Sequence, residues 1–226
     1  MKEAEVWTER GDEFFKAKDY DKAIECFTRA INFNPRASFA FFKRGNVFLA
    51  ANALREALSD FNNAIILNQG FSFAYFKRGD IYLQMRYYNQ AIDDFNTAIE
   101  LNPEFSFAYF KRGMAYFKMK DYDNALEDFD RAIELNPAYM PAHLNKGNIK
   151  FEMRNFEDAI KEYTRALSLD DKQEKTFIAR GIALAQLNRI KDALNDYTSA
   201  VNINPENPIS FNYRGMIYIR LREYEK

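Results

Sequence analysis

The sequence predicts an all-α fold built from repeated helical hairpins, and three observations support this prediction. Seven of the eight glycines recur at a constant spacing of 34 residues, which reveals an internal period. Within each period, apolar residues recur at helical spacing in two runs. A short polar turn such as Lys18-Asp19 separates the runs, and Asn-Pro closes four of the units. The periodic glycines are Gly11, Gly45, Gly79, Gly113, Gly147, Gly181 and Gly215.

The period divides the chain into six full units and part of a seventh. With each glycine as position 8 of its unit, positions 20 and 27 are alanine and position 24 is aromatic in every full unit. The first run predicts one helix, the turn falls near positions 15 and 16, and the second run predicts an antiparallel helix. Position 8 then lies opposite position 23 or 24, so small residues stand where the helices come closest. The units are 4–37, 38–71, 72–105, 106–139, 140–173, 174–207 and, in part, 208–226, and we expect a single array over 4–226.

The composition argues against a catalytic site or a metal site in this chain. One cysteine, Cys26, excludes an internal disulfide, and with the single histidine, His143, it excludes nearly every Cys/His metal site and the usual histidine-based catalytic groups. The repeat geometry places no two carboxylates as a convergent pair, so we expect no enzyme, no cofactor and no metal. The formal net charge of −1 makes nucleic acid a poor partner. No segment predicts a signal peptide or a membrane span, so we expect a cytoplasmic protein, with nuclear or cytoskeletal association left open.

The recurring residues resemble the tetratricopeptide repeat from about Ala4 to Lys226. The resemblance rests on an aromatic at position 4, glycine at 8, alanine at 20 and 27, an aromatic at 24 and proline at 32 in four units. It implies a right-handed α-solenoid superhelix of helix-turn-helix repeats, in which the first helices line a concave face. It also implies a scaffold that binds peptides or other proteins, and it does not name the partner.

A basic residue occupies position 7 of every unit, where the family usually has leucine. Position 23 is acidic in units two to six and lies across from position 7 in the antiparallel arrangement, so we predict an ion pair inside each of these hairpins. The alternative is a basic ladder that binds an acidic ligand. Unit one has Cys26 at position 23, which should leave Arg10 freer. The predicted pairs are Arg44–Asp60, Arg78–Asp94, Arg112–Asp128, Lys146–Glu162 and Arg180–Asp196.

In the family, positions 2, 5, 6, 9, 12 and 13 of the first helix face the concave surface. Positions 2 and 5 are phenylalanine in units two, three and four, and residues three apart share a helix face, so these rings predict an aromatic column across three helices. The alternative is that the rings are buried between first helices or only record a recent duplication. The predicted groove residues are Phe39, Phe42, Lys43, Asn46, Phe73, Phe76, Lys77, Asp80, Phe107, Phe110, Lys111 and Met114.

This groove predicts a partner segment, either a peptide or an amphipathic helix, with apolar anchors and acidic flanks that meet the three rim lysines. The clamp that chaperone-binding members use for a terminal carboxylate requires Lys and Asn at positions 5 and 9 of one unit. Units two to four have Phe42 and Asn46 there, followed by Lys77, and no other window supplies the clamp. We therefore do not expect binding to chaperone tails of that kind.

Three regions depart from the pattern. The fifth unit is the weakest match, with His143 in an aromatic position that predicts core packing, and the charged run 169–175 after it predicts either a small hinge or a solvated turn. Unit one has Glu13 at position 10 and reads as an N-terminal cap. The seventh hairpin is incomplete, so Phe211, Ile217 and Tyr218 should be left without a second helix. This predicts a fragment of a longer protein, or a structural component that docks or self-associates through residues 208–226.

Overall fold

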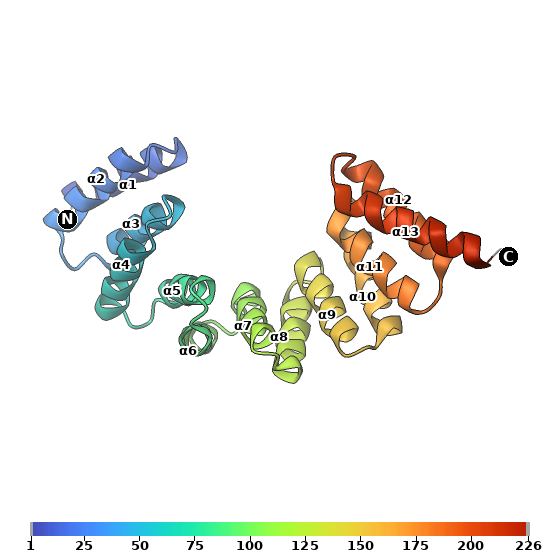
Figure 1. The fold of residues 1–226 in the computed structure, drawn as a ribbon. Coiled ribbons are helices and arrows are strands. Elements are labelled where there is room, and N and C mark those ends of the chain that lie inside the picture. The colour runs from blue at the N-terminus through green and yellow to red at the C-terminus, as the bar shows by residue number, and fades with distance from the viewer. Residues whose placement is uncertain (1, 225–226) are drawn as a thin grey trace. The chain divides into compact units, whose positions relative to one another are not determined.

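The computed structural model describes residues 2–224, and this part of the chain forms thirteen helices and no strand (Figure 1). The fold is an all-α helical-repeat solenoid. The helices are α1 (Lys2–Lys16), α2 (Tyr20–Phe33), α3 (Ser38–Ala50), α4 (Leu54–Leu67), α5 (Ser72–Gln84), α6 (Tyr88–Leu101), α7 (Ser106–Lys118), α8 (Tyr122–Leu135), α9 (Met140–Glu152), α10 (Phe156–Leu169), α11 (Glu174–Gln186), α12 (Ile190–Ile203) and α13 (Pro208–Tyr224).

The chain divides into two compact structural units, each of which contains several repeats: Met1–Met119 with α1 to α7, and Lys120–Lys226 with α8 to α13. From here on, "unit" means one of these two parts, and a single 34-residue period is called a repeat. Within each unit every helix packs against the next one along the chain, as the predicted hairpins require. First helices of neighbouring repeats also touch, α1 with α3 and α5 with α7 in the first unit and α9 with α11 in the second. The charged run 169–175 comprises the last residue of α10, the turn 170–173 and the first two residues of α11, inside the second unit.

The interhelical turns have one conformation in all six hairpins of the described chain. Position 15 is left-handed each time, with φ between 59° and 64°, at Lys18, Asn52, Arg86, Lys120, Arg154 and Asn188. A non-glycine residue in this region costs energy, so the recurrence shows that the turn is determined by the helices it joins. In three hairpins the next residue caps the second helix, because the side chains of Asp19, Asp121 and Asn155 accept the backbone N–H three residues later.

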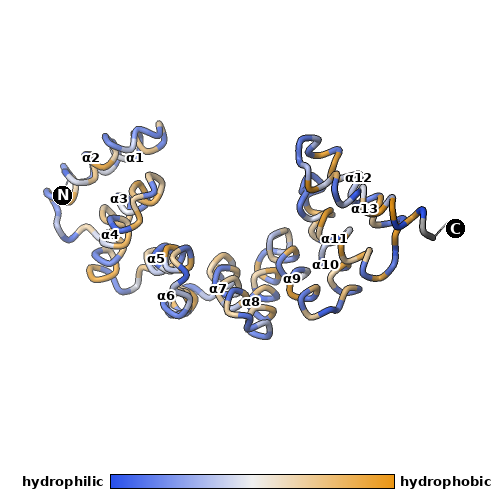
Figure 2. The backbone as a smooth tube through the Cα atoms, viewed as in Figure 1, coloured by the Kyte–Doolittle hydropathy of each residue, from blue (hydrophilic) through white to orange (hydrophobic). Residues whose placement is uncertain are grey.

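The core repeats with the same period. The position-24 rings are almost completely buried, from Phe27 to Tyr197, and the alanines at positions 20 and 27 are fully buried. Figure 2 shows apolar and polar residues mixed along the helices. The small and large residues therefore occupy the places that the 34-residue period predicts for them.

Candidate functional site

The arginines at position 7 form the predicted ion pairs inside their hairpins. Nε and Nη2 of Arg44 lie 2.8 Å from the two carboxylate oxygens of Asp60. Arg78 holds Asp94 at 2.8 and 2.6 Å, and Arg180 holds Asp196 at 2.8 and 2.7 Å. Lys146 also meets Glu162, at 3.1 Å. Four of the five predicted pairs are thus confirmed, and the pair of Arg112 with Asp128 stays a prediction.

Each of these cations makes a further contact that sequence reasoning missed. Nη1 of Arg78 donates to Asn62 at 2.6 Å, and Nη1 of Arg44 donates to Thr28 at 2.9 Å. Each arginine is therefore also hydrogen-bonded to the second helix of the preceding repeat. The signal was a polar residue at position 25, which is Thr28, Asn62, Asn96, Asp130 and Thr164 in the first five repeats. Arginines whose Nε, Nη1 and Nη2 each donate to a side chain of the fold are poorly placed to act as a basic ladder for a ligand.

The predicted aromatic column separates into exposed and buried rings, all in the first unit. Phe39, Phe73 and Phe107 at position 2 are 51%, 48% and 46% exposed. At position 5, Phe76 and Phe110 are only 9% and 8% exposed, and Phe42 is half-buried. Phe76 and Phe110 are therefore core residues, as the alternative interpretation has it, and only the position-2 rings offer a partner a large apolar surface.

The buried rings are covered by aromatic residues that the groove prediction left out. The Phe71 ring lies 4.7 Å from the Phe42 ring between centroids, and Phe105 lies 4.7 Å from Phe76. Phe105 also contacts the exposed Phe73, at 4.9 Å. Both Phe71 and Phe105 are the last residue of their repeat, position 34, and their recurrence was the available signal. The exposed rings of Phe39 and Phe73 therefore each lie against an aromatic ring that is already packed, Phe71 and Phe105 respectively.

The rim lysines are not equivalent. Lys43 pairs with Asp12 of the preceding repeat at 3.0 Å, and Lys111 pairs with Asp80 at 2.7 Å. The residue that corresponds to these aspartates for Lys77 is Asn46, which is neutral, and Lys77 has no carboxylate partner within residues 2–222. Lys77 is therefore the rim cation whose charge the fold leaves uncompensated. Asp80, Lys111 and the half-buried Met114 line a shallow hollow of about 250 Å³.

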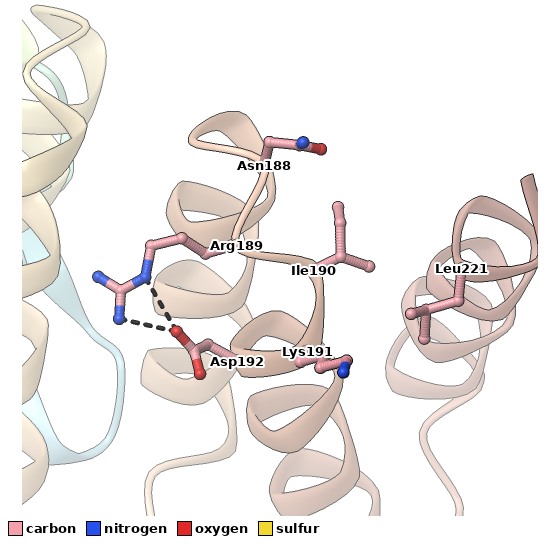
Figure 3. Close-up of a pocket in the computed structure, with 6 residues that line it drawn as sticks. All are labelled: Asn188, Arg189, Ile190, Lys191, Asp192 and Leu221. Carbon is pink, nitrogen blue, oxygen red and sulfur yellow. Dashed lines mark hydrogen bonds and ion pairs between the residues drawn. The ribbon is translucent and has the colours of Figure 1, made fainter. Parts of the chain in front are cut away.

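A second hollow of about 350 Å³ lies in the other unit, between the turn after α11 and helix α13 (Figure 3). The close-up shows Arg189 paired with Asp192, with Nε at 2.9 Å from the carboxylate, and the aliphatic side chains of Ile190 and Leu221 on the two walls. The ion pair is internal to the fold and the walls belong to the surrounding apolar cluster. This hollow therefore predicts no particular ligand.

His143 and Cys26, for which the sequence predicts no functional role, lie in the packed interior. His143 is buried, and its Nδ1 lies 2.8 Å from Glu162, which also accepts Lys146. Cys26 is buried, and burial raises the pKa of its thiol, which keeps it unreactive. On α13, Phe211 and Tyr218 are exposed as predicted. The expectation for Ile217 was wrong, because Ile217 packs into the cluster of Leu184 and Ile190.

Sequence profiles of the tetratricopeptide repeat match residues 4–36, 72–105, 106–139 and 141–173. No curated protein matches the chain significantly. Among solved structures, PilF of Pseudomonas aeruginosa is 14% identical with a TM-score of 0.82, over 95% of this chain and 98% of that one. A tetratricopeptide repeat protein of Parabacteroides merdae is 20% identical with a TM-score of 0.79, over 100% and 89%. YrrB, described as having an unusual peptide-binding site, is 23% identical with a TM-score of 0.69, over 85% and 99%.

These likenesses agree with the geometry of the repeats. The profile matches together cover more than half of the chain, and the structural neighbours share its fold. None of the helices within residues 2–224 is long and apolar enough to cross a membrane. Tetratricopeptide repeats form a fold that supports protein–protein interaction. This chain belongs to the tetratricopeptide repeat family.

Proposed function

We propose that this chain is a non-enzymatic scaffold that binds a segment of a partner protein along the first helices of its first unit. The observation that carries the proposal is the row of half-exposed rings at one repeat position, Phe39, Phe73 and Phe107. Such rings are costly to leave in water, and three of them at equivalent positions of α3, α5 and α7 exceed what a scatter of surface residues explains. YrrB, a protein of the same fold, is described as having a peptide-binding site, which supports this use of the repeats.

The predicted charge preference of the partner rests on Lys77. Lys43 and Lys111 are neutralised by Asp12 and Asp80, so they add little net attraction for an acidic ligand. Lys77 stands between them on α5 without a carboxylate of its own in the described chain. We therefore expect the partner segment to place an acidic residue at Lys77, between apolar side chains that pack on Phe73 and Phe107.

The test uses a displayed library of random 12-residue peptides, selected on the immobilised protein. Peptides that enrich are expected to carry apolar anchors and an acidic residue, and to lose about 100-fold in affinity for the variant Phe39→Ser/Phe73→Ser/Phe107→Ser by fluorescence anisotropy. The matched control is Phe33→Ser/Ile66→Ser/Leu101→Ser, which removes three other exposed apolar residues, from α2, α4 and α6. Equal loss in both variants, or loss of helicity in the first, would contradict the groove.

The same peptides test the role of Lys77. Lys77→Gln is expected to weaken binding about 5-fold to 10-fold and to reduce its dependence on salt, because an unpaired cation is removed. Lys43→Gln is the control, since Asp12 already compensates that lysine. If both lysine variants bind alike, the acidic preference is wrong while the apolar part of the proposal stands.

A second candidate function is assembly through α13, and the observation that favours it is that five large apolar side chains of this helix are exposed, Ile209, Phe211, Met216, Tyr218 and Ile219. We expect the apparent mass in light scattering to rise with protein concentration, and the variant Phe211→Ser/Tyr218→Ser to abolish that rise. Both rings are exposed, so the variant should keep its fold. A mass that does not change with the concentration of the parent protein would contradict the assembly function, and it would leave the proposed peptide-binding groove untouched.

A further inference from the structure

The last residue of a repeat is a buried or partly buried phenylalanine in the second and third repeats, but not in the first repeat. Phe71 fills the space beside α3, where it packs on Phe42, and Phe105 fills the space beside α5, where it packs on Phe76. The corresponding last residue of the first repeat is Ala37. Beside α1 the structure has instead an open slot of about 390 Å³, within the range of about 300–1,000 Å³ typical of ligand pockets. The slot is lined by Ala4, Glu5, Thr8, Glu9, Asp12, Asn34, Ala37, Phe39 and Ala40.

The interior of this slot is apolar. Its floor consists of the buried Ala4 and Ala40, its wall includes the half-exposed Phe39 ring, and Ala37 leaves the space that a ring fills in the next two repeats. The hydroxyl of Thr8 donates to the carbonyl of Ala4 at 2.8 Å. Its donor is therefore already satisfied inside helix α1. A flat apolar side chain could therefore enter without leaving a buried polar group unpaired.

The mouth of the slot is acidic. Glu5 and Glu9 lie on its lining and are exposed, and neither has a cationic partner in the part of the chain that the structure describes. The third acidic residue, Asp12, is already neutralised by Lys43. Two uncompensated carboxylates beside an apolar slot complement a basic residue that adjoins an apolar one.

We infer that the slot between α1 and α3 binds an aromatic side chain of a partner segment that carries lysine or arginine as the neighbouring residue. The inference deepens the proposed function and rests on it, since the same segment would continue along α3 and α5. The repeats themselves support an aromatic occupant, because Phe71 and Phe105 take the equivalent space. The charges also give the segment a direction, from a basic end at Glu5 and Glu9 to an acidic residue at Lys77.

The test follows backbone amide signals by NMR while N-acetyl-Arg-Phe-amide or N-acetyl-Glu-Phe-amide is added to the full chain. The arginine peptide is expected to shift the signals of Thr8, Ala37 and Ala40 in a saturable way, and the glutamate peptide to bind about 5-fold more weakly or worse. Ala37→Phe should abolish these shifts, because its own ring would fill the slot as Phe71 does. Glu5→Gln/Glu9→Gln, at two exposed positions, should remove the preference between the peptides even if Ala37→Phe does not fold.

Phe73→Ser/Phe107→Ser separates this inference from the proposed function. That variant should keep the dipeptide shifts, since the slot lies beside α1, while it loses the selected 12-residue peptides. The inference is overturned if the arginine peptide shifts no slot signals, if a folded Ala37→Phe variant binds it unchanged, or if both peptides bind alike. Concentration-dependent shifts of the same signals without peptide would overturn the partner assignment in favour of a second copy of the chain.

Discussion

Arg78→Met is expected to lower the free energy of unfolding by about 3–5 kcal/mol, because it leaves a buried carboxylate without its cation. The side chain of Asp94 is 6% exposed, and its two oxygens are held by Arg78 at 2.6 and 2.8 Å. Methionine keeps most of the apolar stem, so the loss reports the charge rather than a cavity. Arg78 also donates to Asn62, so the substitution loosens the contact with the preceding repeat as well.

The loss should depend on pH in a defined direction. Burial raises the pKa of the Asp94 carboxyl, and the hydrogen bonds and charge of Arg78 oppose that shift. Without Arg78 the raising effect acts alone, so the pKa in the folded variant lies above the value of about 3.9 in the unfolded chain. A group with a raised folded pKa supports stability below the unfolded pKa and loses that support as the pH rises through the folded pKa. Urea unfolding should therefore show the deficit of Arg78→Met growing from about pH 4 upward.

Two further variants isolate the cause. Arg78→Met/Asp94→Leu removes both charges, and it should recover much of the lost stability because no buried charge is left unpaired. Lys22→Met breaks the pair with Asp19, whose two side chains are both exposed, and it should change the free energy of unfolding very little because solvent screens that pair. If Arg78→Met costs no more than Lys22→Met, or if its deficit does not change with pH, the buried pair is not a determinant of stability.

The sequence alone predicts those features that repeat inside one hairpin. Arg44 and Asp60 are 16 residues apart, and an antiparallel pair of helices with a turn at positions 15 and 16 brings positions 7 and 23 together. The same register brings the position-24 rings onto the glycines. Interactions of this kind depend only on helix periodicity and on the place of the turn, and both can be read from the 34-residue period.

Features that depend on how one repeat stacks on the next could not be predicted in the same way. Phe73 and Phe76 share a helix face, and periodicity gives no reason for one ring to be exposed and the other buried. Phe105, a residue outside the predicted helical runs, contacts both rings, and Phe76 is buried because it also packs against Phe95 of α6, with 5.9 Å between the ring centroids. The bond from Arg78 to Asn62 likewise joins two repeats. The slot beside α1 arises from a missing ring at Ala37, which has meaning only once the place of Phe71 is known.

The substitution of alanine for glycine is expected to have opposite effects at two equivalent positions of the second unit. A Cβ on Gly147 would lie 2.5 Å from Cε1 of Tyr163. That ring is 2% exposed and its hydroxyl donates to Asn148 at 3.0 Å, so it has little room to move. Gly147→Ala should therefore lower the free energy of unfolding by about 1–3 kcal/mol through overpacking.

Gly215 occupies the same repeat position on α13, and a Cβ there would meet nothing within 4 Å. Gly215→Ala should raise helix stability by up to about 1 kcal/mol, because alanine restricts the unfolded chain and favours the helix. Thermal unfolding of the two variants, with amide exchange across α9 and α13 to locate each effect, checks the opposite signs. A loss of stability at both positions would contradict this prediction, because the described chain places no atom within 4 Å of a Cβ at Gly215.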